Sequence, residues 1–399
     1  MEHVSLFKQA KALEGTVRCH RRRLHAIAEP GFAVKRTNAY IEKELSRLSI
    51  PHRPCGGGIV AHLGKGTGGV LLRADTDALP IREMTEEPFC ATGDAMHACG
   101  HDMHTAMLLG AAELLKGHEE ELCAPVTLML QPAEELLEGA ALMLSEGVLE
   151  KEPRAAFALH VLTAVPLETG TLLVPPAGEA TARVSYFSLL FVGRGSHGAM
   201  PHLGIDPLSA AAHTLLALDA LIPKTESPKE EALLSVGFLR GGESFNAVPD
   251  EAALGGSLRT HDERTEARLL RRIETLSKEL SHAFGVDAFF TRERSCPSLL
   301  ADATVRQGVL SLLKESCPEL PLQAVGTPGA KPTGGSEDFA FVSRRIPSLM
   351  LSLAAGEEKR GYTYPLHHPR TAFDEAALPY GTAAHAAVGL YLPSYLQNM

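Results

Sequence analysis

The apolar residues of this chain follow two different periods in turn, and this alternation is what most constrains the fold. Apolar runs typical of buried strands, at 68–75, 125–132 and 155–161, are separated by segments whose apolar residues recur every three or four positions, as in helices. Strands that alternate with helices usually form a largely parallel sheet with helices on both faces. We therefore predict an α/β domain of this kind, which begins with one amphipathic helix over residues 6–27.

The middle of the chain has a different order of elements. The pattern predicts strand, helix, strand, strand, helix and strand, at 184–192, 206–222, 233–241, 253–261, 263–284 and 286–293. Asp206 is the expected N-cap of the first helix, and Gly285 is expected to end the second. This β-α-β-β-α-β order is that of ferredoxin-like α+β domains. We predict that residues 181–295 form such a domain, inserted into a discontinuous domain made of 1–180 and 296–399.

Composition excludes several classes of protein. The chain of 399 residues is long enough for two or three domains, and its formal net charge of −10 without a basic stripe argues against nucleic-acid binding. No apolar run is long enough to span a membrane, and the N-terminal segment lacks the apolar core of an export signal. Seven cysteines at irregular spacing do not indicate a disulfide framework. These features predict a cytoplasmic protein with mostly free thiols.

Side chains that bind metals gather around the predicted strand ends. The motif "MHACGHDMHT" at 96–105 precedes a helix, while carboxylates and a histidine follow neighbouring strands. Because the carboxyl ends of parallel strands face one crevice, we expect these groups to converge there. The members of this set are Asp75, Asp77, Cys99, His101, Asp102, Glu134, Glu135 and His160.

Each of these residues also has a plainer interpretation. A buried cysteine usually packs as a small hydrophobe, a glutamate pair usually begins an exposed helix, and His160 alone would more often be a core histidine. For Cys99 the nearby His101 favours a metal ligand, and the glutamate pair follows a strand and a proline, which favours a functional role. A rival chemistry stays open at this point, with Cys99 as a nucleophile and a histidine as its base.

Nine motifs in order carry a resemblance to a known family: "RRRLHAIAEPGF", "RADTDALP", "MHACGHDMHTAMLLGAAELL", "LQPAEE", "ALHV", "GRGSHGAMPHLGIDP", "FNAVPDEAALGGSLRT", "GGSEDFAF" and "LHHPRTAFDE". From about residue 15 to 390 the chain resembles the M20 metallopeptidase clan. The nearest subgroup is its amidohydrolases, which include aminoacylases, hippurate hydrolases and indole-acetyl-amino-acid hydrolases. The departure is at 136–138, where relatives usually have glycines and this chain has Leu-Leu-Glu, so the resemblance does not define the pocket there.

The resemblance implies two divalent metal ions, usually zinc, manganese, cobalt or nickel. The implied ligands are Cys99, His101, Glu135, His160 and His367, with His368 as the alternative to His367. Cysteine takes a bridging position that many relatives fill with aspartate, and thiolate favours softer metals. Glu134 matches the general base that acts on metal-bound water. In the inserted domain, the groups that match contacts to the substrate carboxylate or the developing oxyanion are His202, Asn246 and Arg259.

The implied activity is hydrolysis of the amide bond of N-acyl amino acids, such as N-acetyl or N-benzoyl derivatives, which releases a carboxylic acid and a free amino acid. The inserted domain is then a lid that also forms a homodimer, and the partner is a small-molecule substrate rather than a nucleic acid or a membrane. Two alternatives are a metal-dependent dipeptidase or carboxypeptidase of the same clan, and a non-catalytic protein that binds N-acyl amino acids.

Overall fold

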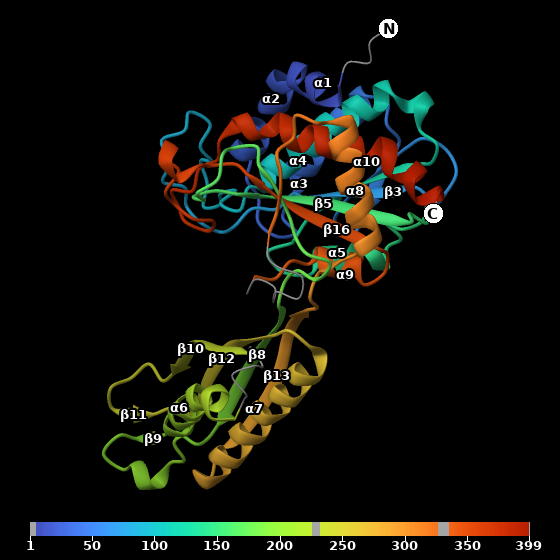
Figure 1. Ribbon diagram of the computed structural model, residues 1–399. Helices are drawn as coiled ribbons and strands as arrows, with labels where there is room; N and C mark the ends of the chain where they lie inside the picture. Colours follow the sequence, from blue (N-terminus) through green and yellow to red (C-terminus); the bar gives the residue numbers. More distant parts are fainter. Residues whose placement is uncertain (1–4, 226–231, 326–334, 399) are drawn as a thin grey trace. The chain divides into compact units, whose positions relative to one another are not determined.

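The computed structural model divides the chain into two compact units, labelled by element in Figure 1. The described residues are 5–225, 232–325 and 335–398. Among them, the first unit comprises 5–180, 299–325 and 338–398. The second unit comprises 181–298 together with the short segment 335–337. The second unit therefore ends at residue 298 rather than at the predicted 295, and it also includes the segment 335–337.

An eight-stranded sheet forms the centre of the first unit. Its strands, in spatial order, are β1 (His52–Cys55), β2 (Gly58–Leu63), β4 (Val126–Gln131), β3 (Val70–Asp75), β5 (Ala155–Leu162), β16 (Ser348–Ala354), β6 (Leu172–Val174) and β15 (Leu322–Ala324). The four central strands, β4, β3, β5 and β16, run parallel to one another. Every residue of β3 and β4 is buried, because helices cover both faces, and this is why their sequences are almost continuously apolar.

Helices cover both faces of this sheet (Figure 1). On one face lie α4 (His101–Gly117), α8 (Ala303–Ser316) and α10 (Leu378–Gln397), and on the other lie α5 (Gly139–Ser145) and α9 (Phe339–Ser343). Helix α4 is buried along most of its length, which explains its apolar sequence on all sides. The predicted α/β fold with a largely parallel sheet is confirmed.

The prediction of a single helix over residues 6–27 is wrong in one respect. The structure has α1 (Leu6–Ala12) and α2 (Glu14–Ala26), while α3 (Lys35–Arg47) follows separately. Leu13, between the first two, has φ −86° and ψ 0°, a right-handed conformation whose ψ departs from the value of about −42° in a regular helix. Apolar residues on both sides of this break are buried, so the apolar stripe continues across it and conceals the break in the sequence.

The second unit has the predicted ferredoxin-like order. Its elements are β8 (Arg183–Val192), α6 (Pro207–Thr225), β10 (Leu233–Gly241), β12 (Glu251–Thr260), α7 (Glu263–Ala283) and β13 (Asp287–Cys296). The strands form an antiparallel sheet in the order β10-β12-β8-β13, against which α6 and α7 pack. As predicted, Asp206 accepts a hydrogen bond from the Leu208 N–H at 2.9 Å, and Gly285 follows α7 with φ +69°. The α+β architecture of this unit is confirmed.

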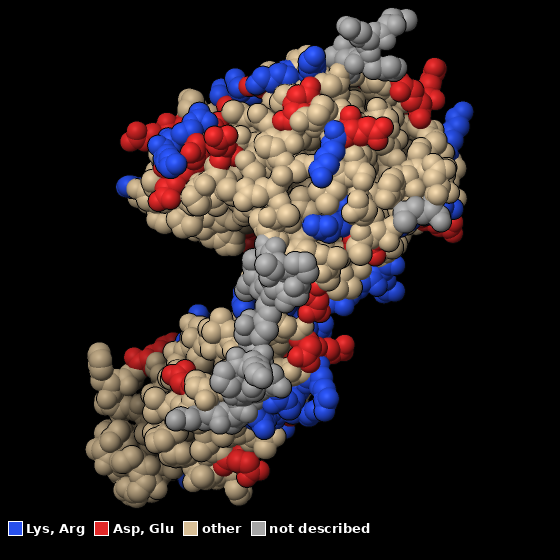
Figure 2. Space-filling model, in the orientation of Figure 1, with Lys and Arg blue, Asp and Glu red and all other residues tan. Residues whose placement is uncertain are grey.

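Two observations concern the outer surface. No helix among the described residues has both the length and the apolar character that a membrane crossing requires. On the face drawn in Figure 2, Lys and Arg side chains are scattered among Asp and Glu side chains rather than gathered into one stripe.

Candidate metal centre

Five side chains of the first unit that the sequence proposes as metal ligands lie together, and we call them the donor cluster: Cys99, His101, Glu135, His160 and His367. Cys99 Sγ lies 3.5 Å from His160 Nε2 and 3.3 Å from His367 Nε2. Glu135 Oε1 lies 3.4 Å from His367 Nε2 and 3.9 Å from His101 Nε2. The cluster contains two groups of three donors, each within 4.8 Å, that share Cys99.

The fold explains why residues so far apart in sequence meet here. Glu135 follows β4, His160 lies near the end of β5, and His101 is the first residue of α4. These positions are at the carboxyl edge of the parallel strands, where α/β sheets bind ligands. The two groups of three are Cys99 with His101 and His160, and Cys99 with Glu135 and His367. Cys99 is therefore placed to serve two neighbouring ions.

Gly100 lies between two members of the cluster, Cys99 and His101, at a position that only glycine fits. Gly100 has φ +83°, and a Cβ there would meet Val161 Cγ2 at 2.3 Å and the Phe373 ring at 3.0 Å. The left-handed backbone turns the chain between Cys99 and His101, so that both side chains reach the same point.

Gly100→Ala is expected to destabilise the protein by at least about 1–3 kcal/mol, because the new methyl group overpacks a filled core and the backbone is strained. It should also weaken metal binding, because both neighbours belong to the donor cluster. Denaturant unfolding of the metal-free protein measures the first effect. Gly93→Ala is the matched control, since nothing lies within 4 Å of the added Cβ. Equal stability of the two variants would contradict this account of Gly100.

Hydrogen bonds orient two of the imidazoles toward the cluster. The Nδ1 of His101 donates to the Asp77 carbonyl oxygen at 2.8 Å, and the Nδ1 of His160 donates to the Val161 carbonyl oxygen at 2.7 Å. In the neutral form of each ring, Nε2 is then unprotonated and directed at the cluster, which is the usual arrangement of a metal-binding histidine.

Two buried atoms of the cluster make no hydrogen bond among the described residues: His101 Nε2 and Glu135 Oε1. Buried polar atoms are almost always partnered, so these atoms call for a partner of another kind. A sulfur, imidazole nitrogens and a carboxylate directed at one point form a donor set typical of zinc and similar ions. The residues present therefore fit a metal centre.

Asp77 holds the glutamate pair in place. Its two carboxylate oxygens accept hydrogen bonds from the Glu134 N–H at 3.0 Å and the Glu135 N–H at 3.3 Å. On either side of the pair, Ala133 and Leu137 have φ of +55° and +57°, which costs energy for residues other than glycine. The sequence had placed Asp77 among the metal-affine groups, but it did not predict that this residue clamps the loop.

The structure also separates the two adjacent histidines. His367 lies in the donor cluster, with φ +65° and its backbone N–H donating to the Ala98 carbonyl oxygen at 3.0 Å. His368 instead stacks on Tyr364, with ring centroids 4.6 Å apart. The geometry therefore favours His367 as the candidate ligand.

Burial shifts the pKa values of the cluster. It raises the pKa of the Cys99 thiol, raises that of Glu135, and lowers the pKa of His160 to about 3. His160 is thus neutral, as ligation requires. A divalent cation would supply the positive charge that favours the thiolate and the carboxylate.

Two aspartates from the metal-affine set face other partners. Asp102 binds Arg21 at 2.9 Å and His25 at 2.8 Å, so it ties α4 to α2 and lies outside the donor cluster. Burial raises its pKa, but the charges of Arg21 and His25 lower the pKa further, so the net shift is downward. Asp75 hydrogen-bonds to Arg73 at 2.7 Å. Asp102 is therefore a structural anchor, whereas Asp75 also lies 3.6 Å from His101 Nε2 and forms a further group of potential ligands with His101 and His104.

The remaining predicted residues all belong to the second unit. His202 is exposed in the short helix Pro201–Leu203. Asn246 is exposed and accepts a hydrogen bond from the Ser244 hydroxyl at 2.7 Å. Arg259 lies on β12, partly buried, with Nη1 3.4 Å from the Ser336 hydroxyl. Their roles toward a substrate stay predictions.

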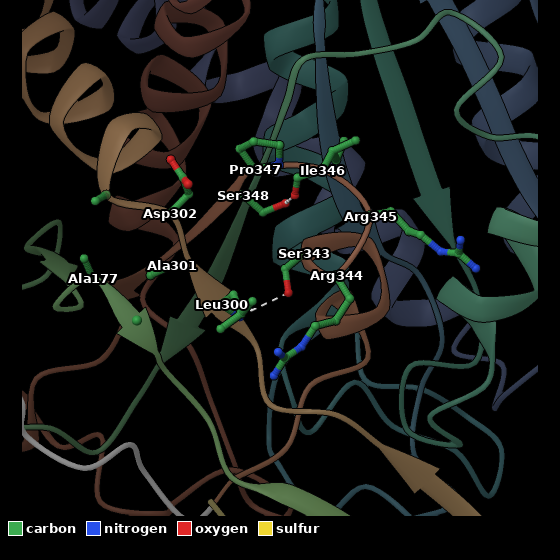
Figure 3. Close-up of a pocket in the computed structure, with 12 residues that line it drawn as sticks. Ala177, Leu300, Ala301, Asp302, Ser343, Arg344, Arg345, Ile346, Pro347 and Ser348 are labelled. Atoms are coloured by element: carbon green, nitrogen blue, oxygen red, sulfur yellow. Dashed lines mark hydrogen bonds between the residues drawn. The ribbon is translucent and has the colours of Figure 1, made fainter. Parts of the chain in front are cut away.

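A separate hollow of about 410 Å³ lies in the first unit, and Figure 3 shows it. It is bordered by the starts of α8 and β16, where the Ser343 hydroxyl accepts a hydrogen bond from the Leu300 N–H at 3.0 Å. Ser348, the first residue of β16, pairs with Ala156. The hollow is therefore at the amino edge of these strands, and none of the predicted site residues lines it.

Comparison with known proteins decides what kind of protein this donor cluster belongs to. Residues 71–390 match peptidase family M20/M25/M40. The chain belongs to this family. It is a metal-dependent hydrolase of the M20 type, so the predicted family is confirmed.

Relatives of this M20 hydrolase are named for related activities. It is 34% identical to IAA-amino acid hydrolase ILR1-like 2 of Arabidopsis thaliana, over 93% of this chain and 83% of that protein. It is 32% identical to N-acetyl-L-cysteine deacetylase of Bacillus subtilis, over 90% of this chain and 83% of that protein. Among solved structures, the chain is similar to the YXEP protein of Bacillus subtilis, which is described as a dinuclear metal-binding peptidase of the M20 family. The two are 29% identical with a TM-score of 0.76, over 96% of this chain and 99% of that chain.

Proposed function

We propose that this M20 hydrolase cleaves the amide bond of N-acyl amino acids, releasing a carboxylic acid and a free amino acid. The observation that carries the proposal is the sharing of Cys99 by two groups of three donors, with the Glu134 carboxylate beside them. The relatives named as an N-acetyl-L-cysteine deacetylase and an IAA-amino acid hydrolase support this substrate class.

The donor cluster would hold two divalent ions, one at Cys99, His101 and His160 and the other at Cys99, Glu135 and His367. The dinuclear description of the YXEP protein supports this number. When bound, such ions lower the pKa of water and polarise a carbonyl group. The thiolate favours zinc, cobalt or nickel over harder ions, although manganese is also used in the family that the sequence resembles.

Glu134 is the proposed general base. Its Oε2 lies 3.9 Å from His101 Nε2, and its backbone is fixed by Asp77, so the carboxylate stays at the edge of the cluster. In the proposed reaction, Glu134 takes a proton from the attacking water as the new C–O bond forms. It then returns that proton to the amine nitrogen as the C–N bond breaks.

Arg259 is the proposed group that binds the substrate carboxylate, because its planar guanidinium can pair with a carboxylate through two hydrogen bonds. Converting that carboxylate to an amide is expected to lower kcat/KM strongly in the wild type and little in Arg259→Ala. Steady-state kinetics with N-acetyl amino acids and their amides measure this. Equal losses in both proteins would rule out Arg259 as the carboxylate contact.

His202 and Asn246 are proposed to contact the substrate or its developing oxyanion, and the second unit is proposed to act as a lid that also forms a homodimer. The cytoplasmic location likewise stays a prediction.

A substrate panel tests the proposed function. N-acetyl, N-benzoyl and N-indoleacetyl amino acids should be hydrolysed by the metal-loaded enzyme faster than unmodified dipeptides. Faster dipeptide cleavage would favour the alternative of a metal-dependent dipeptidase or carboxypeptidase. Binding of N-acyl amino acids without turnover, with metal present, would favour a binding protein instead.

A further inference from the structure

A histidine outside the donor cluster makes two buried hydrogen bonds beside it. His104 lies one turn after His101 on α4 and is fully buried. Its Nδ1 lies 2.6 Å from Asp75 Oδ1, and its Nε2 lies 2.8 Å from the backbone nitrogen of Val161.

These two contacts fix the protonation of the ring. The Val161 nitrogen carries a hydrogen and can only donate, so Nε2 of His104 has to accept and is unprotonated. The single proton of the neutral ring is then on Nδ1, which donates it to Asp75. His104 therefore connects a carboxylate to a backbone N–H in one defined orientation.

The carboxylate end of this connection is rigidly held. Asp75 is the last residue of β3 and is fully buried, and Arg73 Nη1 lies 2.7 Å from its Oδ2. Arg73 in turn donates through Nε to Gln131 at 2.9 Å, on the neighbouring strand β4. His104 is thus anchored to the central sheet rather than to a surface loop.

The backbone end of the connection lies next to a member of the donor cluster. Val161 directly follows His160, and its carbonyl oxygen accepts the hydrogen bond from His160 Nδ1 at 2.7 Å. The rings of His104 and His160 also touch, with centroids 4.7 Å apart at an angle of 60°. His104 therefore contacts the strand end that carries His160 and also packs against the ring itself.

We propose that His104 is a positioning residue of the metal centre. Its hydrogen bonds to Asp75 and to the Val161 N–H fix the end of β5, and this keeps His160 Nε2 directed at Cys99. This inference rests on the proposed dinuclear function. It assigns no contact between His104 and a metal or substrate.

Two substitutions separate the two hydrogen bonds. The amide of Gln reaches about as far as Nε2 of histidine, so His104→Gln can still accept the Val161 N–H but removes the donor to Asp75 Oδ1. The amide of Asn reaches only as far as Nδ1, so His104→Asn keeps Asp75 bonded and releases Val161. Both variants lose one buried hydrogen bond, so both should lose stability to a similar extent.

Metal affinity should instead depend on whether a variant keeps the hydrogen bond from the Val161 N–H. Metal-free protein is titrated with Zn²⁺ in competition with a chromophoric chelator, and the absorption bands of the Co²⁺ form are recorded. In His104→Asn we expect about 10- to 100-fold weaker binding of one of the two ions, the range found when a group that orients a ligand is removed, together with altered Co²⁺ bands. His104→Gln should remain much closer to the wild type in both.

His385→Ala is the matched control, because His385 is an equally buried histidine whose ring nitrogens make no hydrogen bond among the described residues. It should lose stability and keep both ions. Equal affinity in the Asn and Gln variants, or affinity that follows unfolding stability across all three variants, would overturn the proposal.

The unmodified protein provides a second measurement if a variant does not fold. Long-range ¹H–¹⁵N spectra of histidine-labelled protein should show the His104 ring, assigned through its contacts with Val161 and His160, with a protonated Nδ1 and an unprotonated Nε2 that Zn²⁺ does not shift to a metal-bound position. Absence of such a ring would also overturn the proposal. Failure of the wild type to bind two ions would count against the proposed function itself, whereas wild-type binding in His104→Asn would count against this inference alone.

Discussion

Glu134→Gln is expected to lower kcat by at least about 10²–10⁴-fold, the contribution typical of general base catalysis, while both metal ions stay bound. The amide has nearly the same shape as the carboxylate but cannot take a proton from water. Its backbone N–H keeps the hydrogen bond to Asp77, so the loop should not move. Steady-state kinetics and metal analysis of the same preparation measure the two effects.

Glu138→Gln is the control, because Glu138 belongs to the same loop and lies outside the groups of potential metal ligands among the described residues. It should turn over close to the wild-type rate. Turnover of Glu134→Gln near the wild-type rate would remove Glu134 from the mechanism, and loss of metal from this variant would make it a ligand instead.

Cys99→Ala is expected to lower metal content and activity together. Removing a group that merely orients a ligand costs about 10- to 100-fold in metal affinity, so loss of a ligand shared by two ions should cost at least as much. Because both groups of three donors include Cys99, the affinity for both ions should fall. Metal analysis after dialysis at fixed free Zn²⁺, with parallel assays, measures this.

Cys55→Ala and Cys123→Ala are the controls. Cys55 is buried and its thiol contacts the Met143 carbonyl oxygen, whereas Cys123 is exposed. Both variants should keep two ions and full activity. Full metal loading in Cys99→Ala would contradict the assignment of this cysteine.

The periodic pattern predicted the fold well because burial determines it. Strands such as β3 and β4 are covered on both faces, so their residues are apolar without interruption, and the pattern shows this directly. The pattern was less accurate at boundaries. It did not show the break at Leu13 between α1 and α2. A break that leaves the apolar stripe intact produces no signal in the sequence.

The candidate site could be predicted where residues follow strands. Glu135 and His160 lie at the ends of strands, and Cys99 and His101 lie at the start of α4, so the predicted strand ends and helix start brought these four residues to one edge of the sheet. His367 came only from the resemblance, because it lies on a loop whose path the pattern does not define.

The hydrogen-bond partners that orient these groups could not be predicted. His104 pairs with Asp75 and with Val161, which lie 29 and 57 positions away in the chain. The only signal was the second histidine of "HDMH", at the spacing that places it on the same side of α4 as His101. Such a spacing occurs in many helices, and it does not specify the partners of the ring.

The most direct test of the account is a metal titration of the metal-free enzyme, in which N-acyl amino acid hydrolysis is followed while Zn²⁺ or Co²⁺ is added. The account predicts no turnover without metal, two ions bound per chain, and activity that rises with loading. Full activity in protein shown to contain no metal, and lost on alkylation of Cys99, would contradict it.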